Sequence, residues 1–273
     1  DRQCSSYDNE TAPFGGTAEV SYSWDADRPF VAGSFVWAGF DYLGEPTPYS
    51  SYPSKNSYYG IIDTAGFPKD IYYFYQSRWT SEPMVHVLPH WNWSEGEVIT
   101  IFVYSNCDSV ELFLDNASQG SRTVTADTLR LEWVVDWEPG TLRAECTRDG
   151  SVVAEDKVET AGEADAVVLS ADRTTINADG RDLVFVTADI RDADGVFVPT
   201  ADNSVRFSVS GPGEIIGTDN GNAVDTTSYQ NPSRKAFNGK VLAIVRSTSE
   251  AGEIVVTADS SGLTSGSATV TAE

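Results

Sequence analysis

Residues 33–49 have the sequence Gly-Ser-Phe-Val-Trp-Ala-Gly-Phe-Asp-Tyr-Leu-Gly-Glu-Pro-Thr-Pro-Tyr. The first part, residues 34–40, is a short apolar run of the kind that forms a strand buried on both faces. The second part, residues 41–49, is a loop that carries two carboxylates and two phenols. A (β/α)8 barrel presents its binding site at the carboxyl ends of such strands, so the stretch predicts a barrel strand ending at a binding site.

The segments on either side of this stretch have helical patterns. Residues 17–27 begin with a threonine cap and carry apolar side chains at Val20 and Trp24. Residues 68–79 begin with proline, which is favoured in the first turn of a helix. A helix, a strand, a long loop and a second helix are what the end of a barrel contains, and we assign them to a domain at residues 1–83.

The rest of the chain has the pattern of short strands separated by turns. All seven tryptophans lie at or before Trp137, so the composition changes near residue 161. We expect strands at 98–104, 109–114, 131–137, 141–148 and 152–159, and then at 167–171, 183–191, 205–210, 240–246 and 253–258. The predicted fold is mainly β, with the last strand and helices of a barrel followed by two immunoglobulin-like β-sandwiches, at 84–161 and 162–273.

The charge of the chain excludes two classes of partner. It has 41 acidic and 18 basic residues and a formal net charge of −23, which would repel nucleic acid and anionic lipid. No apolar run is long enough to cross a membrane. Both a secreted acidic protein and a salt-adapted one have such a composition. A periplasmic or secreted location is favoured, and a cytoplasmic one in a salt-adapted organism is the alternative.

The three cysteines, Cys4, Cys107 and Cys146, lack the spacing of metal ligands. Cys107 and Cys146 fall in neighbouring predicted strands. Two buried thiols are the favoured interpretation, and a disulfide between them is the alternative.

The pattern Phe35-Val-Trp37 followed by Asp41 resembles the last barrel strand of glycoside hydrolase family 2, the β-galactosidase and β-glucuronidase family. The resemblance implies that Trp37 lines the sugar subsite beside the catalytic nucleophile. An indole suits this role because its flat apolar face can stack on a pyranose; a core tryptophan is the alternative. Asp41 and Glu45 are candidates to bind sugar hydroxyls, or else to cap backbone N–H groups.

A second segment, residues 55–70, resembles the part of the family that leads into the last barrel helix. β-Glucuronidases have Asn-x-Lys before the glycine that corresponds to Gly60, because a lysine neutralises the substrate carboxylate. This chain has Ser57-Tyr-Tyr59 there. The resemblance therefore favours neutral sugars, galactosides first, with Tyr59 either facing the sugar or packed. The predicted substrate-binding residues are Trp37, Asp41, Glu45 and Tyr59.

Retaining glycoside hydrolysis needs two carboxyl groups, an acid/base and a nucleophile. Asn9-Glu10 is similar to the family's acid/base pair, but that pair is followed by four barrel strands and here only one follows. We reject it and expect both catalytic glutamates upstream of Asp1. The chain is thus predicted to hold no catalytic residue, to be inactive alone, and to have the remainder of the same enzyme as its partner; a homo-oligomer is left open.

Three further groups of residues have types that could bind a metal ion or a sugar. His86 and His90 are four residues apart, but Pro89 breaks any helix that would place them together, so a strand with packed aromatics is favoured over a metal site. Asp189, Asp192 and Asp194 form an incomplete calcium-loop pattern, and an acidic turn is favoured. We predict no cofactor and no metal. Trp91 and Trp93 support the alternative function, a non-catalytic carbohydrate-binding or adhesion module.

Overall fold

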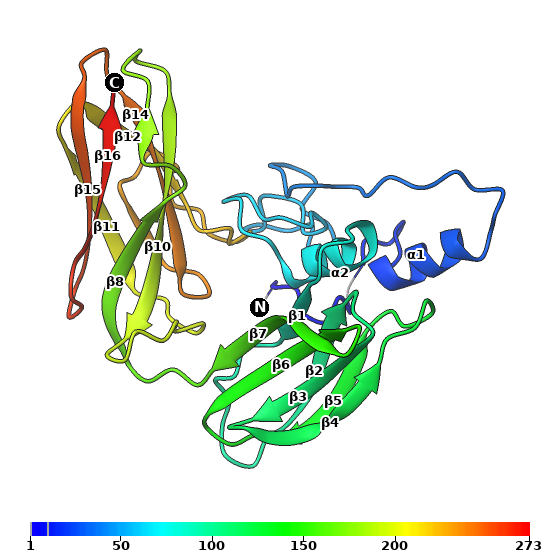
Figure 1. The fold of residues 1–273 in the computed structure, drawn as a ribbon. Helices are drawn as coiled ribbons and strands as arrows, with labels where there is room; N and C mark the ends of the chain where they lie inside the picture. Colours follow the sequence, from blue (N-terminus) through cyan, green and yellow to red (C-terminus); the bar gives the residue numbers. More distant parts are fainter. Residues whose placement is uncertain (1, 10) are drawn as a thin grey trace. The chain divides into compact units, whose positions relative to one another are not determined.

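The computed structural model describes residues 2–9 and 11–273 and shows a mainly β chain (Figure 1). It divides into two compact units, Asp1–Thr160 and Ala161–Glu273. None of the helices in the described ranges is long and apolar enough to cross a membrane. The division into three domains remains a prediction.

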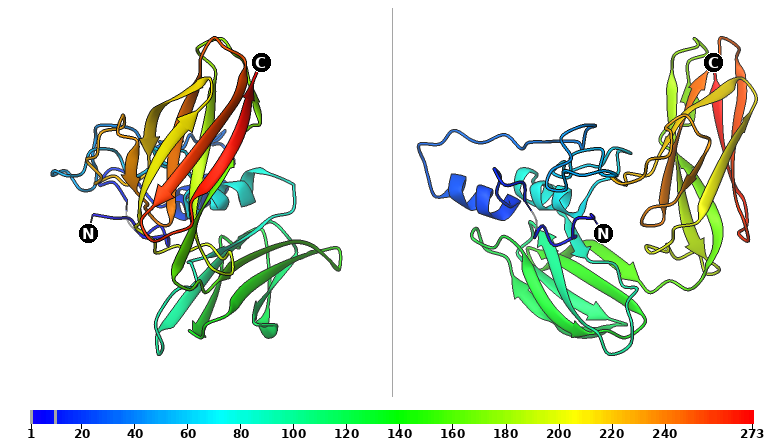
Figure 2. Two further views of the ribbon diagram at one scale, coloured as in Figure 1. Left: turned by 90° about the vertical axis from the view of Figure 1, so that its left-hand side faces the viewer. Right: turned by 180° about the vertical axis from the view of Figure 1, so that it is seen from behind.

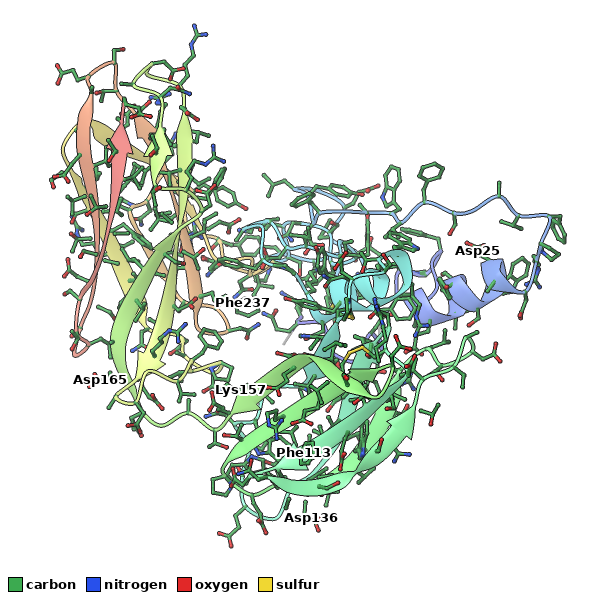
Figure 3. The ribbon with its side chains drawn as sticks, in the orientation of Figure 1. Asp25, Phe113, Asp136, Lys157, Asp165 and Phe237 are labelled. Atoms are coloured by element: carbon green, nitrogen blue, oxygen red, sulfur yellow. A yellow bond between two sulfur atoms is a disulfide. The ribbon has the colours of Figure 1, made fainter. Side chains whose placement is uncertain are left out.

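The first unit contains a sandwich of two antiparallel sheets. One sheet has the order β1-β2-β5 and the other β4-β3-β6-β7. The strands are β1 (Val85–Leu88), β2 (Val98–Ser105), β3 (Ser109–Leu114), β4 (Ala117–Thr123), β5 (Leu131–Asp136), β6 (Thr141–Arg148) and β7 (Ser151–Glu159). Strand β5 alternates strictly: Trp133 faces the core between the sheets, and Asp136 ends the strand in solvent (Figure 3). This alternation is why its sequence predicted a strand.

Strand β2 is buried on both faces because helix α2 (Asp70–Trp79) covers the side turned away from the sandwich core. Ile101 points into the sandwich, whereas Phe102 and Tyr104 pack with the fully buried Phe74 of α2. The helix predicted at 68–79 is confirmed, with its first residue at Asp70. A small aromatic core therefore attaches α2, and the segment that leads into it, to the sandwich.

Helix α1 (Ala18–Ala26) confirms the helix predicted at 17–27. Thr17 is its N-cap, and the Thr17 hydroxyl accepts the N–H of Val20. Asp8 adds a second cap, because its carboxylate accepts the N–H of Ala18 at 2.9 Å. Val20 and Trp24, the apolar positions that indicated a helix, are exposed.

The buried strand predicted at residues 34–40 is not present, and this prediction is wrong. Of this run only Phe40 makes a β-bridge, to Ile62, and Phe35 is fully exposed. A barrel strand is buried by strands on both sides and by helices outside them. The described residues supply no such neighbours, so the run is irregular chain with a bend at Trp37, and Phe35, Trp37 and Phe40 are exposed.

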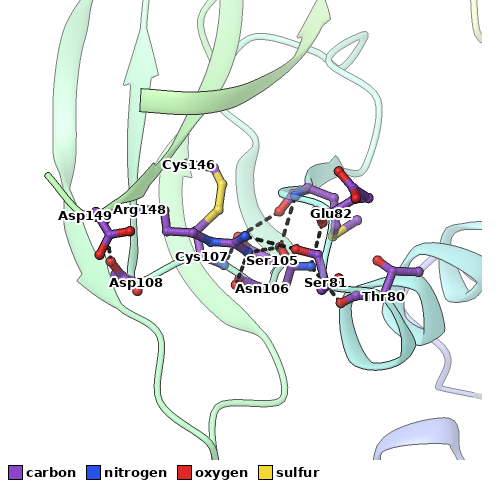
Figure 4. Close-up of a disulfide and its surroundings, with 11 residues drawn as sticks. Thr80, Ser81, Glu82, Ser105, Asn106, Cys107, Asp108, Cys146, Arg148 and Asp149 are labelled. Carbon is purple, nitrogen blue, oxygen red and sulfur yellow. Dashed lines mark hydrogen bonds between the residues drawn. A yellow bond between two sulfur atoms is a disulfide. The ribbon is translucent and has the colours of Figure 1, made fainter. Parts of the chain in front are cut away.

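Cys107 and Cys146 form a disulfide, so the prediction of two free thiols is wrong. Cys107 lies in the connection from β2 to β3, which belong to different sheets, and this connection passes over β6 with the two Cα atoms 5.8 Å apart. Beside the bond, Arg148 donates hydrogen bonds of 2.9 Å to the carbonyls of Ser81 and Asn106 (Figure 4). Strand patterns in the sequence do not reveal which residues a connection brings together.

The second unit is a separate sandwich with its own core (Figure 2). Its sheets have the orders β12-β14-β10-β8 and β13-β11-β15-β16-β9, and all neighbours are antiparallel except β16 and β9. The strands are β8 (Ala164–Ala171), β9 (Thr175–Ile176), β10 (Leu183–Asp192), β11 (Ser204–Ser210), β12 (Gly213–Asp219), β13 (Ser233–Lys235), β14 (Lys240–Ser247), β15 (Gly252–Ser260) and β16 (Gly266–Ala272). The prediction missed four of them, β9, β12, β13 and β16, which are short or rich in small residues.

Candidate functional site

The candidate site is built on two segments that lie side by side, residues 37–44 and 55–62. Backbone hydrogen bonds join them; in one, the N–H of Asp41 donates to the carbonyl of Ile62 at 2.8 Å. The close approach requires Gly60, because a Cβ at this position would lie 2.1 Å from the backbone nitrogen of Asp41. Glycine at this position lets the two segments touch, and this fixes the side chains that they carry.

Three side chains of these segments, together with Glu45 directly after the first one, form one hydrogen-bonded group, Trp37, Tyr42, Glu45 and Tyr59, which we call the Trp37 cluster. The indole N–H of Trp37 donates to the hydroxyl oxygen of Tyr42 at 3.1 Å. The Tyr42 hydroxyl donates to Glu45 Oε2 and lies 2.7 Å from the hydroxyl oxygen of Tyr59. Tyr59 in turn donates to Glu45 Oε2 at 3.0 Å. Three of the four predicted substrate-binding residues are thus brought together.

The cluster presents an aromatic face and a negative charge to solvent. Trp37 is 74% exposed, and the Trp37–Ala38 peptide is cis. Hydrogen bonds from Tyr42 and then Tyr59 hold the pKa of the Glu45 carboxyl below its usual value. Burial, together with the hydrogen bonds to Tyr42 and Glu45, raises the pKa of Tyr59. Glu45 is therefore an anion and Tyr59 a neutral phenol at neutral pH.

Asp41, the fourth predicted residue, is buried and does not belong to the Trp37 cluster. Its carboxylate accepts the N–H of Gly60 at 2.8 Å and forms an ion pair of 2.6 Å with Lys69. Burial raises the pKa of Asp41, while Lys69, Gly60 and the Ser57 hydroxyl act in the opposite direction. These contacts fit the backbone-capping alternative for Asp41; a direct contact with a sugar stays a prediction.

The sequence did not single out two residues of this site. Tyr42 was noted only as one of the phenols of the loop, yet it contacts all three other members of the Trp37 cluster. Lys69 was assigned only to the start of a helix, yet it neutralises Asp41. Neither has a sequence signal, because both sets of contacts depend on how the chain folds around residues 37–45.

Trp91 and Trp93 do not form an exposed aromatic strip. Trp91 is fully buried in the sandwich core, and Trp93 is half-buried and stacks on His90 with ring centroids 4.8 Å apart. The predicted strand with packed aromatics is confirmed by β1 and this packing. The feature that supported a carbohydrate-binding module is therefore absent from this segment.

His86 lies between two carboxylates. Its Nε2 is 2.8 Å from Asp70 on α2, and its Nδ1 is 3.3 Å from Asp156 on β7. Tyr73 stacks on the ring with centroids 3.7 Å apart. A neutral imidazole has one N–H, so both contacts are satisfied only by the charged form. His86 thus ties helix α2 to the sandwich.

The acidic turn of the second unit caps backbone groups. Asp192 accepts N–H groups of Gly162, Asp194 and Val196 at 2.7–3.0 Å, while Asp189 pairs with Arg191 and Lys240. Among the described residues, no group of three or more His, Cys, Asp or Glu side chains is arranged to hold a metal ion. Glu10, rejected as a catalytic acid, lies outside the described residues.

The chain is similar to parts of several glycoside hydrolases. Residues 167–269 match "Glycoside hydrolase family 2 C-terminal domain 5", and residues 96–154 match a domain of unknown function, DUF4982. The chain is 46% identical to the β-galactosidase BoGH2A of Bacteroides ovatus over 95% of its own length and 31% of that protein. It is 36% identical to a putative β-glucuronidase of Formosa agariphila, over 92% and 25% of the two lengths.

Solved structures agree with these matches. A β-glycosidase from Bacteroides vulgatus is similar with a TM-score of 0.92 and 37% identity, over 98% of this chain and 34% of that one. The chain belongs to glycoside hydrolase family 2. It spans about a third or less of the length of each of these three relatives.

Proposed function

We propose that this chain forms one wall of the sugar-binding site, together with accessory sandwiches, in a retaining glycoside hydrolase that cleaves terminal β-D-galactosides or related neutral glycosides. The observation that carries the proposal is the Trp37 cluster. It combines an exposed indole face with a carboxylate and two phenols. Aromatic faces that stack on a sugar ring, with a few polar groups that fix its orientation, are what sugar recognition requires.

The charges around the cluster support a neutral sugar. Glu45 is an anion, and Lys69, the N-cap of α2, already pairs with Asp41 at 2.6 Å. A uronate would need a cation at this place. Because the relatives include both a β-galactosidase and a putative β-glucuronidase, this difference in charge is the basis for preferring a galactoside.

We further propose that the catalytic pair comes from another part of the enzyme. A retaining mechanism places two carboxyl groups about 5–5.5 Å apart on either side of the scissile bond. Asp41 is occupied by Gly60 and Lys69, and Glu45 by two phenols. The exposed side chains of Phe30, Phe35 and Phe40 would then pack against the remainder of a barrel.

The test compares turnover of aryl β-glycosides by two proteins, the polypeptide that carries this chain in its source and residues 1–273 alone. The source polypeptide should hydrolyse a chromogenic β-galactoside and act far more slowly on the matching β-glucuronide, and the chain alone should hydrolyse neither. If the source polypeptide binds glycans but hydrolyses no aryl glycoside, the proposal is wrong. Preferred turnover of the glucuronide would refute only the assignment to neutral sugars.

A further inference from the structure

We propose that Tyr42 is a positioning residue, which fixes the orientation of the Trp37 indole by linking it to the Glu45 carboxylate. The inference rests on the proposed function, since it concerns how the sugar-stacking surface is held. It adds a residue to that site and gives Glu45 a role other than direct contact with a sugar.

The hydrogen bonds around Tyr42 leave little freedom. A phenol has one proton to donate and two lone pairs to accept with. Tyr42 accepts the indole N–H of Trp37 at 3.1 Å and donates its own proton to Glu45 Oε2. The proton therefore points toward Glu45, and a lone pair remains directed at the indole.

Tyr59 holds the carboxylate from the other segment. Its hydroxyl oxygen lies 3.0 Å from Glu45 Oε2 and 2.7 Å from the Tyr42 oxygen, and the two phenol rings meet edge to face with centroids 6.0 Å apart. Tyr42 on its own segment and Tyr59 on the paired one are the titratable groups that hydrogen-bond Glu45. An ionised Glu45 can accept both phenol protons through charge-assisted bonds.

The orientation of the indole depends on its hydrogen bond to Tyr42, because most of the side chain is exposed to solvent. Trp37 is 74% exposed, and it lies at a bend in irregular chain, not in a strand. Stacking on a sugar requires the ring to stand at one angle before the sugar arrives. Protonation of Glu45 replaces a charged acceptor by a weaker neutral one, so the hydrogen bond at the indole should respond to that titration.

The first experiment follows the indole N–H resonance of Trp37 in the chain of residues 1–273, labelled with ¹⁵N and assigned with Trp37→Phe. As the pH falls from 7 to 2.5, this resonance should move with the titration of a carboxyl group. In Tyr42→Phe it should lose this response and exchange faster with water. Glu45→Gln should also remove the pH response. Tyr52→Phe, which alters an exposed tyrosine outside the cluster, should keep it.

An unchanged pH response of the Trp37 resonance in Tyr42→Phe would overturn the inference. The six other tryptophans report on folding in the same spectra. This measurement does not depend on catalysis, so it decides on Tyr42 even if the proposed function fails.

The second experiment measures steady-state kinetics in the source polypeptide with an aryl β-galactoside. Tyr42→Phe should raise KM by about 3- to 10-fold, the change expected for one lost hydrogen bond, with a smaller effect on kcat. The double variant Trp37→Ala/Tyr42→Phe should be no worse than Trp37→Ala, because Tyr42 acts through the indole. Additive losses would show that Tyr42 acts by another route and would contradict the inference.

Discussion

The second sandwich buries its apolar side chains, whereas the segment of residues 33–63 exposes several of its own. In the sandwich, Val245 and Ile254 are fully buried between two sheets that belong to the same unit. In the segment, Phe35 and Trp37 are exposed, and the chain is held by polar contacts such as Asp41 with Lys69. The sandwich is stabilised by apolar contacts between its own two sheets, whereas the segment leaves apolar side chains available for contacts outside it. Substitutions in the buried core of the sandwich should therefore lower the free energy of unfolding more than substitutions in the segment.

The largest effect is expected in the second unit, where Arg234 is fully buried. Its guanidinium pairs with Asp225 at 2.6 Å and donates to the carbonyls of Thr227 and Ser228. Arg234→Ala leaves the Asp225 carboxylate without the cation that pairs with it. The variant should lower the free energy of unfolding by about 3–5 kcal/mol, as other broken buried ion pairs do. Urea unfolding measures it, with Arg246→Ala as the control.

Arg246 pairs with Glu214 at the surface of the same unit, so its removal should cost less than about 1 kcal/mol. Equal losses of unfolding free energy in the two variants would show that Arg234 is not buried in the core.

The disulfide of the first sandwich should give the next largest effect. Cys107 and Cys146 are 39 residues apart, and closing a loop of that length stabilises a fold by about 2–4 kcal/mol. The free energy of unfolding of Cys107→Ala/Cys146→Ala, measured with urea, should be lower than that of the wild type by this amount. A reducing agent should lower the free energy of unfolding of the wild type equally. Cys4→Ser, outside the pair, is the control. Two titratable thiols at these positions in the unreduced protein would contradict the bond.

The third prediction concerns His86, which joins α2 to the sandwich. Burial alone would lower the pKa of His86, but hydrogen bonds to Asp156 and Asp70 outweigh burial and raise it. The stabilisation is fully present below the unfolded pKa of about 6.5 and is lost as the pH rises through the higher folded pKa. His86→Gln should cost about 1.5–3 kcal/mol at pH 5.5 and less at high pH, measured by urea unfolding.

His90 provides the control for the pH dependence. Burial lowers the pKa of His90, so its neutral form is favoured by folding and its effect on stability has the opposite sign. His90→Gln should therefore reduce the loss of stability at low pH. A His86→Gln variant with the same pH profile as the wild type would show that His86 is not charged in the fold.

The smallest change in stability is expected at Gly60, between the two segments that carry the Trp37 cluster. A Cβ there would lie 2.1 Å from the nitrogen of Asp41, so Gly60→Ala must push the two segments apart. The cost should be about 1–3 kcal/mol, and the Trp37 resonance should shift while those of the sandwich core stay in place. Gly39→Ala is the matched control, because a Cβ at Gly39 meets no atom within 4 Å. Equal shifts in both variants would contradict the contact.

The sandwiches were largely predictable from the sequence. Alternation marks β5 and β10 because one face of each strand meets a core and the other meets solvent. Strand β4 lacks that signal because all its residues are exposed, and it was missed. The disulfide was judged wrongly, since the proximity of Cys107 to Cys146 depends on the path of a connection.

The candidate site was predictable only in part. The family resemblance predicts Trp37 and Tyr59, and the position of Glu45 in the acidic loop predicts the third residue; the structure joins them in one hydrogen-bonded group. The strand at 34–40 was predicted from an apolar run, but burial needs neighbours that the described residues do not supply. Tyr42 could not be predicted, because its contacts with Trp37, Glu45 and Tyr59 depend on how the loop folds and not on a sequence motif.

Trp37 is proposed to stack on a neutral sugar. The most direct measurement is kcat/KM of the source polypeptide and its Trp37→Ala variant on an aryl β-galactoside and the matching β-glucuronide. We expect the wild type to prefer the galactoside. Trp37→Ala should lower kcat/KM on the galactoside by about 100-fold or more, which corresponds to about 3 kcal/mol of transition-state stabilisation. Near-normal activity of Trp37→Ala on the galactoside would contradict this proposal.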